Sequence, residues 1–162
     1  MNNKGNMVIG IVLLIVVVFT AGLTGLFMNN IVDEINTEIQ TDNSFNNESK
    51  QIMSGVEETY NPTVDYIIGL ILVLSWLFIL VLAWNGNEHP MLYILLIVIL
   101  IILAIVGAVL SNAWEDVTTE DEFSSAPANF PITNYLLTNF LVVIVLIGFS
   151  AFIIMFIKRR YN

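Results

Sequence analysis

Long runs of apolar residues, separated by polar segments, make up most of the chain. Four stretches carry no Asp, Glu, Lys, Arg or His, and they are residues 5–32, 66–87, 90–114 and 123–157. A membrane-spanning helix needs about 20 mostly apolar residues, and each stretch is long enough to supply them. The pattern therefore predicts an all-α integral membrane protein with four transmembrane helices in an antiparallel bundle.

The apolar positions within these stretches predict where each span begins and ends. The expected spans are residues 7–28, 66–84, 91–111 and 135–157. The first is longer than the apolar core of a signal peptide, which has about 7 to 15 residues, so it is interpreted as an uncleaved transmembrane helix. Pro90 suits the first turn of a helix and is expected to open the third span. The inner connection, residues 85–90, is so short that spans two and three are expected to form a tight antiparallel hairpin.

The first loop between the spans, residues 29–65, has apolar residues at helical spacing. Two stripes share this spacing, and they contain Ile31, Ile35 and Ile39, followed by Ile52, Val56 and Tyr60. The first stripe continues the register of span one, so that helix is expected to extend beyond the bilayer, whereas Asn61–Pro62 is expected to end the second segment. Each stripe is too small for an independent core. We therefore expect the two to pack against each other in an amphipathic helical hairpin, or against a partner.

The second loop, residues 112–134, combines five acidic residues with two prolines. We expect its acidic part to form a solvated turn or a short helix, and residues 124–131 to form an extended strap into span four. The acidic run Glu115–Glu122 lacks the alternating Asp/Asn pattern and the turn glycine of a calcium-binding loop. A solvated acidic surface is therefore the favoured interpretation.

Composition agrees with a membrane protein, because 57% of the residues are hydrophobic and only 12% are charged. The charges also indicate an orientation. Residues 1–6 and 158–162 contain four of the five basic residues, whereas the loops 29–65 and 112–134 carry net charges of −7 and −5. Since basic residues that flank a span stay on the cytoplasmic side, both termini are expected there, with both loops on the opposite side. Such an acidic face disfavours nucleic acid and anionic lipid as partners.

Few residues could carry catalytic or metal chemistry. The chain has no cysteine and one histidine, which excludes disulfides, thiolate metal sites and sites with several histidines. No ionisable residue lies within an expected span, although transporters and proton pumps usually mark their pathways with such residues. We therefore predict no catalytic, cofactor-binding or metal-binding residues, and no enzymatic activity. Asn47–Ser49 matches the acceptor pattern for N-glycosylation, a short motif that also arises by chance.

Small residues within the spans indicate where helices approach one another closely, either within one chain or between copies. They are Ala21, Gly25, Ala104, Gly107, Ala108, Ser111, Gly148 and Ala151.

Aromatic residues indicate how deep each part of a span lies in the membrane. Tyr66, Trp114 and Tyr135 are expected at the headgroup level. Trp76 falls in the middle of span two, so its indole N–H is expected to face another helix or a polar partner.

These features favour a non-enzymatic polytopic membrane protein that acts as a structural or accessory subunit of a larger membrane assembly. Its expected partners are the lipid bilayer and other membrane-protein subunits or copies of itself, in the plasma membrane of a prokaryote or in a virion membrane. The alternative is a small oligomeric channel, transporter or holin-like pore, in which several copies would bring polar span residues around one axis. These residues are Thr20, Thr24, Thr138 and Asn139.

The expected orientation can be tested with single cysteines, because the native chain has none. In intact cells, a Ser44→Cys variant should react with an impermeant thiol reagent, because position 44 lies in a loop expected outside. Asn3→Cys and Asn162→Cys variants should react only after the membrane is opened. Labelling of either terminal position, without labelling at position 44, would reverse the topology.

Overall fold

The computed structural model describes residues 6–85 and 90–161, and within these ranges every regular element is helical. In chain order the elements are α1 (Asn6–Thr41), α2 (Asn47–Asn85), α3 (Pro90–Thr119), the 3₁₀ helix η2 (Asp121–Phe123), α4 (Ala126–Asn129), α5 (Pro131–Thr138) and α6 (Phe140–Tyr161). Four of these helices, α1, α2, α3 and α6, are long and apolar enough to cross a membrane, which confirms the helical class and the number of candidate spans.

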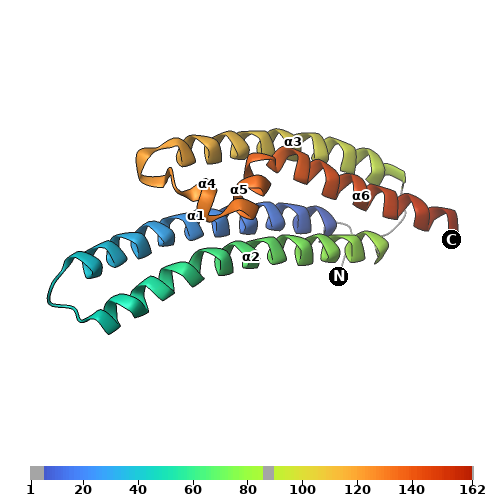
Figure 1. Cartoon of the computed structure of the whole chain (residues 1–162). Coiled ribbons are helices and arrows are strands. Elements are labelled where there is room, and N and C mark those ends of the chain that lie inside the picture. The colour runs from blue at the N-terminus through green and yellow to red at the C-terminus, as the bar shows by residue number, and fades with distance from the viewer. Residues whose placement is uncertain (1–5, 86–89, 162) are drawn as a thin grey trace.

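The long helices pack as two antiparallel pairs. α1 lies along α2 and α3 lies along α6, while contacts between α2 and α6 join the two pairs (Figure 1). The start of α1 and the end of α6 lie at one end of the molecule. The α1–α2 turn and the short helices between α3 and α6 lie toward the other end, which we call the loop end (Figure 1).

The pairing of the helices differs from the hairpin that the short inner connection predicts. Among the described residues, α6 rather than α3 packs beside α2, and α3 packs mainly along α6. A short connection constrains only the helix ends next to it, whereas lateral packing depends on which helix faces fit together closely. Residues 86–89 of that connection lie outside the described residues, as do residues 1–5 and 162 at the termini.

Glycines explain why α3 pairs with α6. A methyl group at Gly107 of α3 would lie 2.6 Å from Ile144 Cδ1 and 3.3 Å from the Leu141 Cα atom of α6. A methyl group at Gly148 of α6 would collide with the Leu100 side chain of α3. Because each helix has a glycine facing the other, their backbones approach more closely than side chains would allow.

The remaining small residues lie at several interfaces. Gly25 of α1 faces α2, where an added methyl group would lie 3.1 Å from Val64 Cγ1. Gly22, which the sequence analysis did not single out, faces α5, where a methyl group would lie 2.5 Å from Leu137 Cδ1. The other predicted packing residues divide into buried Ser111 and Ala151 and half-buried Ala21, Ala104 and Ala108.

The helices of the first pair are longer than the hydrocarbon core of a bilayer is thick. α1 has 36 residues and α2 has 39, so at about 1.5 Å per residue they are about 54 and 58 Å long, compared with a hydrocarbon core of about 30 Å. The extension of α1 to Thr41 agrees with the apolar stripe in the sequence. We call the parts of α1 and α2 at residues 29–41 and 47–65 the arms.

Pro62 does not end the second arm, contrary to the expectation from Asn61–Pro62, because it lies inside the continuous helix α2. Proline within a helix removes one backbone hydrogen bond and costs about 3 kcal/mol. Here α2 is held against α1 on both sides of that position. Glu57 accepts a hydrogen bond from Asn36 of α1 before it, and Val64 packs at Gly25 after it. This packing offsets the local cost.

The turn between the arms is closed by its own side chains. The Ser49 backbone N–H donates to Asn46 Oδ1 at 2.8 Å, which caps the start of α2. The Ser44 backbone N–H donates to Asp42 Oδ1 at 2.7 Å, and this bond is the main reason why the pKa of the Asp42 carboxyl is lowered. These local bonds hold the turn between the two helices.

The segment before α6 also differs from the expected one. α3 continues to Thr119, and η2 forms in the acidic part of the loop, where a turn or short helix was expected. The residues expected as an extended strap, 124–131, instead include α4 and the first residue of α5. Prolines favour first helical turns, and Pro131 opens α5. The expected helix at residues 135–157 is interrupted at Asn139, whose Nδ2 donates to the Tyr135 carbonyl at 2.9 Å. Asparagine side chains compete in this way with helical hydrogen bonding, so α5 ends and α6 begins at Phe140.

The close approach of α3 and α6 predicts opposite effects for the same substitution at two glycines. Gly107→Ala should lower the free energy of unfolding by about 1–3 kcal/mol, because the added methyl group overpacks the α3–α6 contact. Gly55→Ala in α2 meets no atom within 4 Å and should raise stability by about 0.5–1 kcal/mol through helix propensity. Unfolding in detergent, followed by circular dichroism, measures both. Equal stabilities would contradict the close α3–α6 contact.

Candidate binding groove

Polar residues are buried among the helices at the loop end of the molecule. They are Asn29 (4% exposed), Asp65 (3%), Ser111 (7%), Thr118 (8%) and Thr133 (1%). A buried polar group costs free energy unless it is hydrogen-bonded, so each of these side chains requires a partner. Their bonds show how the short helices are attached to the long ones.

Asp65 of α2 attaches α5 through the start of that helix. Its Oδ1 accepts the Thr133 backbone N–H at 2.7 Å, and its Oδ2 accepts the Ile132 backbone N–H at 2.9 Å. The residue before α5 is Phe130, which has no side-chain acceptor to cap the helix itself. Asp65 therefore supplies the cap from another helix, where its negative charge is also favoured by the helix dipole.

A second set of bonds attaches α5 to α3. Trp114 Nε1 donates to Asn134 Oδ1 at 3.0 Å, and Ser111 Oγ donates to the Thr138 carbonyl. Trp114 is completely buried inside the protein, and its expected depth at the headgroup level stays a prediction. The half-buried Asn134 supplies the acceptor that satisfies the indole N–H inside the protein. Tyr66 and Tyr135 are 68% and 69% exposed.

Trp76, farther from the loop end, has the polar partner that its position predicts. Its Nε1 donates to Ser150 Oγ at 2.9 Å, and Ser150 Oγ in turn donates to the Ile147 carbonyl. The bond joins α2 to α6 within the apolar region. It thereby adds a directional link to the contact between the two helical pairs.

Three buried oxygens near the loop end have no hydrogen-bond partner in the described part of the chain: Asp33 Oδ1, Asn61 Oδ1 and Thr133 Oγ1. Asn61 lies one turn before Asp65 on α2 and lines the groove described next. An unpaired buried acceptor of this kind is satisfied by a donor from a ligand or from water.

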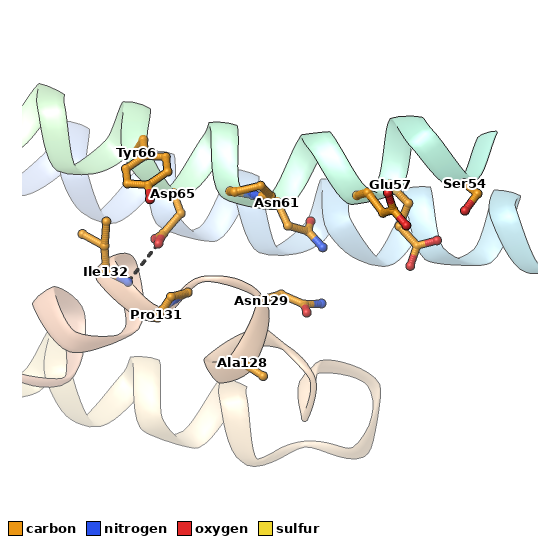
Figure 2. A pocket seen from close by; sticks show the side chains of 11 residues that line it. Ser54, Glu57, Asn61, Asp65, Tyr66, Ala128, Asn129, Pro131 and Ile132 are labelled. Carbon is orange, nitrogen blue, oxygen red and sulfur yellow. Dashed lines mark hydrogen bonds between the residues drawn. The ribbon is translucent and has the colours of Figure 1, made fainter. Parts of the chain in front are cut away.

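A groove of about 590 Å³ separates the second arm from α4 and the start of α5 (Figure 2). Its α2 wall is polar, with Ser54, Glu57, Glu58, Asn61 and Asp65. The opposite wall is formed by Ala128, Asn129, Pro131 and Ile132. Figure 2 shows the Glu57 and Asn61 side chains on the side of α2 that faces α4. We call this space the acidic groove.

A second groove, of about 570 Å³, continues from the acidic groove along α2 and α5. It is lined almost entirely by apolar side chains, including those of Leu70, Val73 and Leu136. Tyr66 and Ile132 line both grooves, so the two spaces meet at these residues. We call the second space the apolar groove. The sequence does not predict either groove, because each combines α2 with a segment about 60 residues later in the chain.

The structure leaves most of the two predicted partner-binding stripes on the surface. Ile31 and Ile35 are 48% and 42% exposed, Ile52 and Val56 are 63% and 45% exposed, and Ile39 and Tyr60 are half-buried. The hydrogen bonds between the arms come from polar side chains. Gln40 Nε2 donates to the Lys50 carbonyl at 2.9 Å, and Lys50 Nζ donates to the Gln40 carbonyl at 2.8 Å. The arms thus meet through polar groups and keep much of their apolar surface available.

Within residues 6–85 and 90–161, no group of three or more His, Cys, Asp or Glu side chains is arranged to hold a metal ion. Comparison with protein-family models, with curated proteins and with solved structures finds no match for this chain. The structure defines the class of this protein, a helical protein with four candidate membrane spans.

The cap on α5 predicts a local effect of changing Asp65. Asp65→Ala should destabilise the attachment of α5 by about 1–3 kcal/mol, since two buried N–H groups lose their acceptor. Asp65→Asn should cost less, because an amide oxygen can accept one of the two bonds. Hydrogen exchange at the Ile132 and Thr133 amides measures the effect, and the exposed Asp116→Asn serves as control. Exchange unchanged in Asp65→Ala would show that the cap does not hold α5.

Proposed function

We propose that this protein is a structural or accessory subunit of a larger membrane assembly, without enzymatic activity of its own. The observation that carries the proposal is the exposed apolar surface on the arms, outside the expected spans. Isolated exposed apolar residues are normal, but a series at helical spacing on a projecting element is typical of an interaction surface. The proposal also includes the four-helix antiparallel bundle in a membrane, with both termini on the cytoplasmic side.

The geometry of the arms supports this role. Ile31 and Ile35 lie one helical turn apart, as do Ile52 and Val56, so each pair shares a helix face. Burying such a side chain contributes about 1.5–3 kcal/mol relative to leaving it in water. Because the arms bond to each other through polar groups, a partner protein or a second copy gains this free energy without opening the arms.

The distribution of charged residues supports the proposed location, as it supports the orientation. Acidic residues are concentrated on the two loops, and basic residues are concentrated near the termini, as expected for a protein of a prokaryotic plasma membrane or of a virion membrane. In either setting the arms extend from the side opposite to the basic termini. They are then available to components outside the bilayer.

A pore built from several copies is the second candidate, and one observation favours it. Thr20 and Thr24 are exposed on α1 and line a groove of about 540 Å³ between α1 and α2. The other two polar residues of that hypothesis are engaged near the junction of α5 and α6. Thr138 Oγ1 lies 3.5 Å from Asn134 Oδ1, and Asn139 Nδ2 bonds the Tyr135 carbonyl. A pore therefore needs an axis formed between copies.

Assembly should depend on Ile35 if the exposed stripe is the contact surface. Ile35→Asp is expected to release the chain from the complex with which it co-migrates after gentle solubilisation, because the charge would be buried without a partner. Thr37→Asp, an exposed position on the same arm, should leave co-migration unchanged. Blue-native electrophoresis of the solubilised native membrane measures both variants.

Two results would contradict the subunit proposal. The first is equal co-migration of both variants together with unchanged protease resistance of the arms. The second is a selective conductance of the purified protein in liposomes that Asn139→Leu abolishes, since this outcome would favour the pore.

A further inference from the structure

The acidic and apolar grooves form one continuous surface with two chemically different halves. The acidic half carries the carboxylates of Glu57, Glu58 and Asp65, and no basic residue lines it. The apolar half contributes almost no polar surface. A ligand that fills both halves must have a polar end and a long apolar part.

The position of the surface along α2 corresponds to the edge of a bilayer. Residues 54–65 of the acidic groove precede the expected second span, and residues 66–73 of the apolar groove lie within it. At about 1.5 Å per residue, the apolar groove reaches about 10 Å from Tyr66 into the membrane. This depth is within one leaflet, which is about 15 Å of hydrocarbon. The exposed Tyr66 ring lies at the boundary, as tyrosines at the headgroup level do.

We propose that the two grooves together bind one phospholipid whose head group ends in an ammonium group. The ammonium lies in the acidic groove near Glu58 and Glu57, and one acyl chain lies in the apolar groove along α2 and α5. The proposal rests on membrane insertion and goes beyond the assembly role, on which it does not depend.

Charge and hydrogen bonding select this head group. Asp65 is already occupied by the Ile132 and Thr133 amides, so Glu57 and Glu58 supply the negative charge that attracts an ammonium. Asn61 lines the acidic groove beside these carboxylates, and its buried Oδ1 has no hydrogen-bond partner among the described residues. A head group with net negative charge would be repelled by the same carboxylates.

The apolar groove distinguishes a lipid from a soluble cation. A free cation would use only the acidic half and would gain nothing from the side chains of Leu70 and Val73. An acyl chain in the apolar groove replaces contacts with bulk lipid. The acyl chain therefore fixes the position of the ligand, while the head group determines which lipid is preferred. The expected preference is therefore modest, because partly exposed ion pairs are weak.

The experiment uses the full chain in nanodiscs that contain equal amounts of phosphatidylethanolamine and phosphatidylglycerol with the same acyl chains. After transfer to detergent, native mass spectrometry counts the lipid molecules that remain bound. We expect a single retained lipid, with phosphatidylethanolamine enriched about three- to fivefold over phosphatidylglycerol, as expected for a partly exposed ion pair. Equal retention, or enrichment of phosphatidylglycerol, would overturn the proposal.

Matched variants test each half of the surface. Glu58→Gln should remove at least about half of the enrichment, whereas Glu38→Gln, an exposed acid on the first arm, should keep it. Glu58 is preferred to Glu57, because Glu57 also accepts the bond from Asn36 that joins the arms.

In the apolar half, Leu70→Trp should fill the groove and reduce the retained lipid of either kind. Leu77→Trp, at a similarly exposed position outside the groove, should not. Circular dichroism verifies that each variant keeps its helices. Retention and enrichment equal to the native chain in both Glu58→Gln and Leu70→Trp would overturn the proposal, whatever the behaviour of the arms.

Discussion

The fold depends on one carboxylate that caps a helix to which it does not belong. In a bilayer or at its edge, each backbone N–H without an acceptor costs several kcal/mol, so the start of a helix there needs acceptors. α5 begins after Phe130, and its first residue, Pro131, has no N–H to satisfy. The next two N–H groups bond to Asp65 of α2. Because α5 leads directly into α6, this cap attaches the second helical pair to the first.

Other buried polar residues also attach the short helices to the long ones. Trp114 and Ser111 bond α3 to α5, and Asn129 Nδ2 reaches Asn29 Oδ1 of α1 at 3.5 Å. Each bond pairs a short element with a long helix, so the short helices are held from several sides. The glycines act at the other contacts, where Gly107, Gly148 and Gly25 bring long helices together without polar groups. The helices are thus held mainly by directional bonds at the loop end. Elsewhere they are held mainly by close apolar packing, to which the Trp76–Ser150 bond adds one directional link.

The sequence predicts the helices much better than their arrangement, for a physical reason. Inside lipid a helix satisfies its own backbone, so apolar length alone indicates the spans. The depth of Trp76 in its span likewise indicates that its indole N–H faces another helix or a polar partner, although not which residue that is. Lateral pairing depends on the fit of whole faces, and a cap supplied by Asp65 to Thr133 joins residues far apart in the chain. The residues near Phe130 in the sequence do not indicate that Asp65 is the acceptor.

A single residue, Ile132, connects the cap on α5 to the acidic and apolar grooves. The Ile132 backbone N–H donates to Asp65, while Ile132 itself lines both grooves at the point where they meet. The acceptor that completes the start of α5 therefore also sets the distance between the two walls of the groove. A ligand seated across this junction contacts α2 and α5 together, so its binding free energy adds to that of the cap and stabilises the same arrangement of helices. The acidic wall cannot be made neutral at Asp65 without weakening this attachment, which leaves Glu57 and Glu58 as the positions where charge selects the ligand.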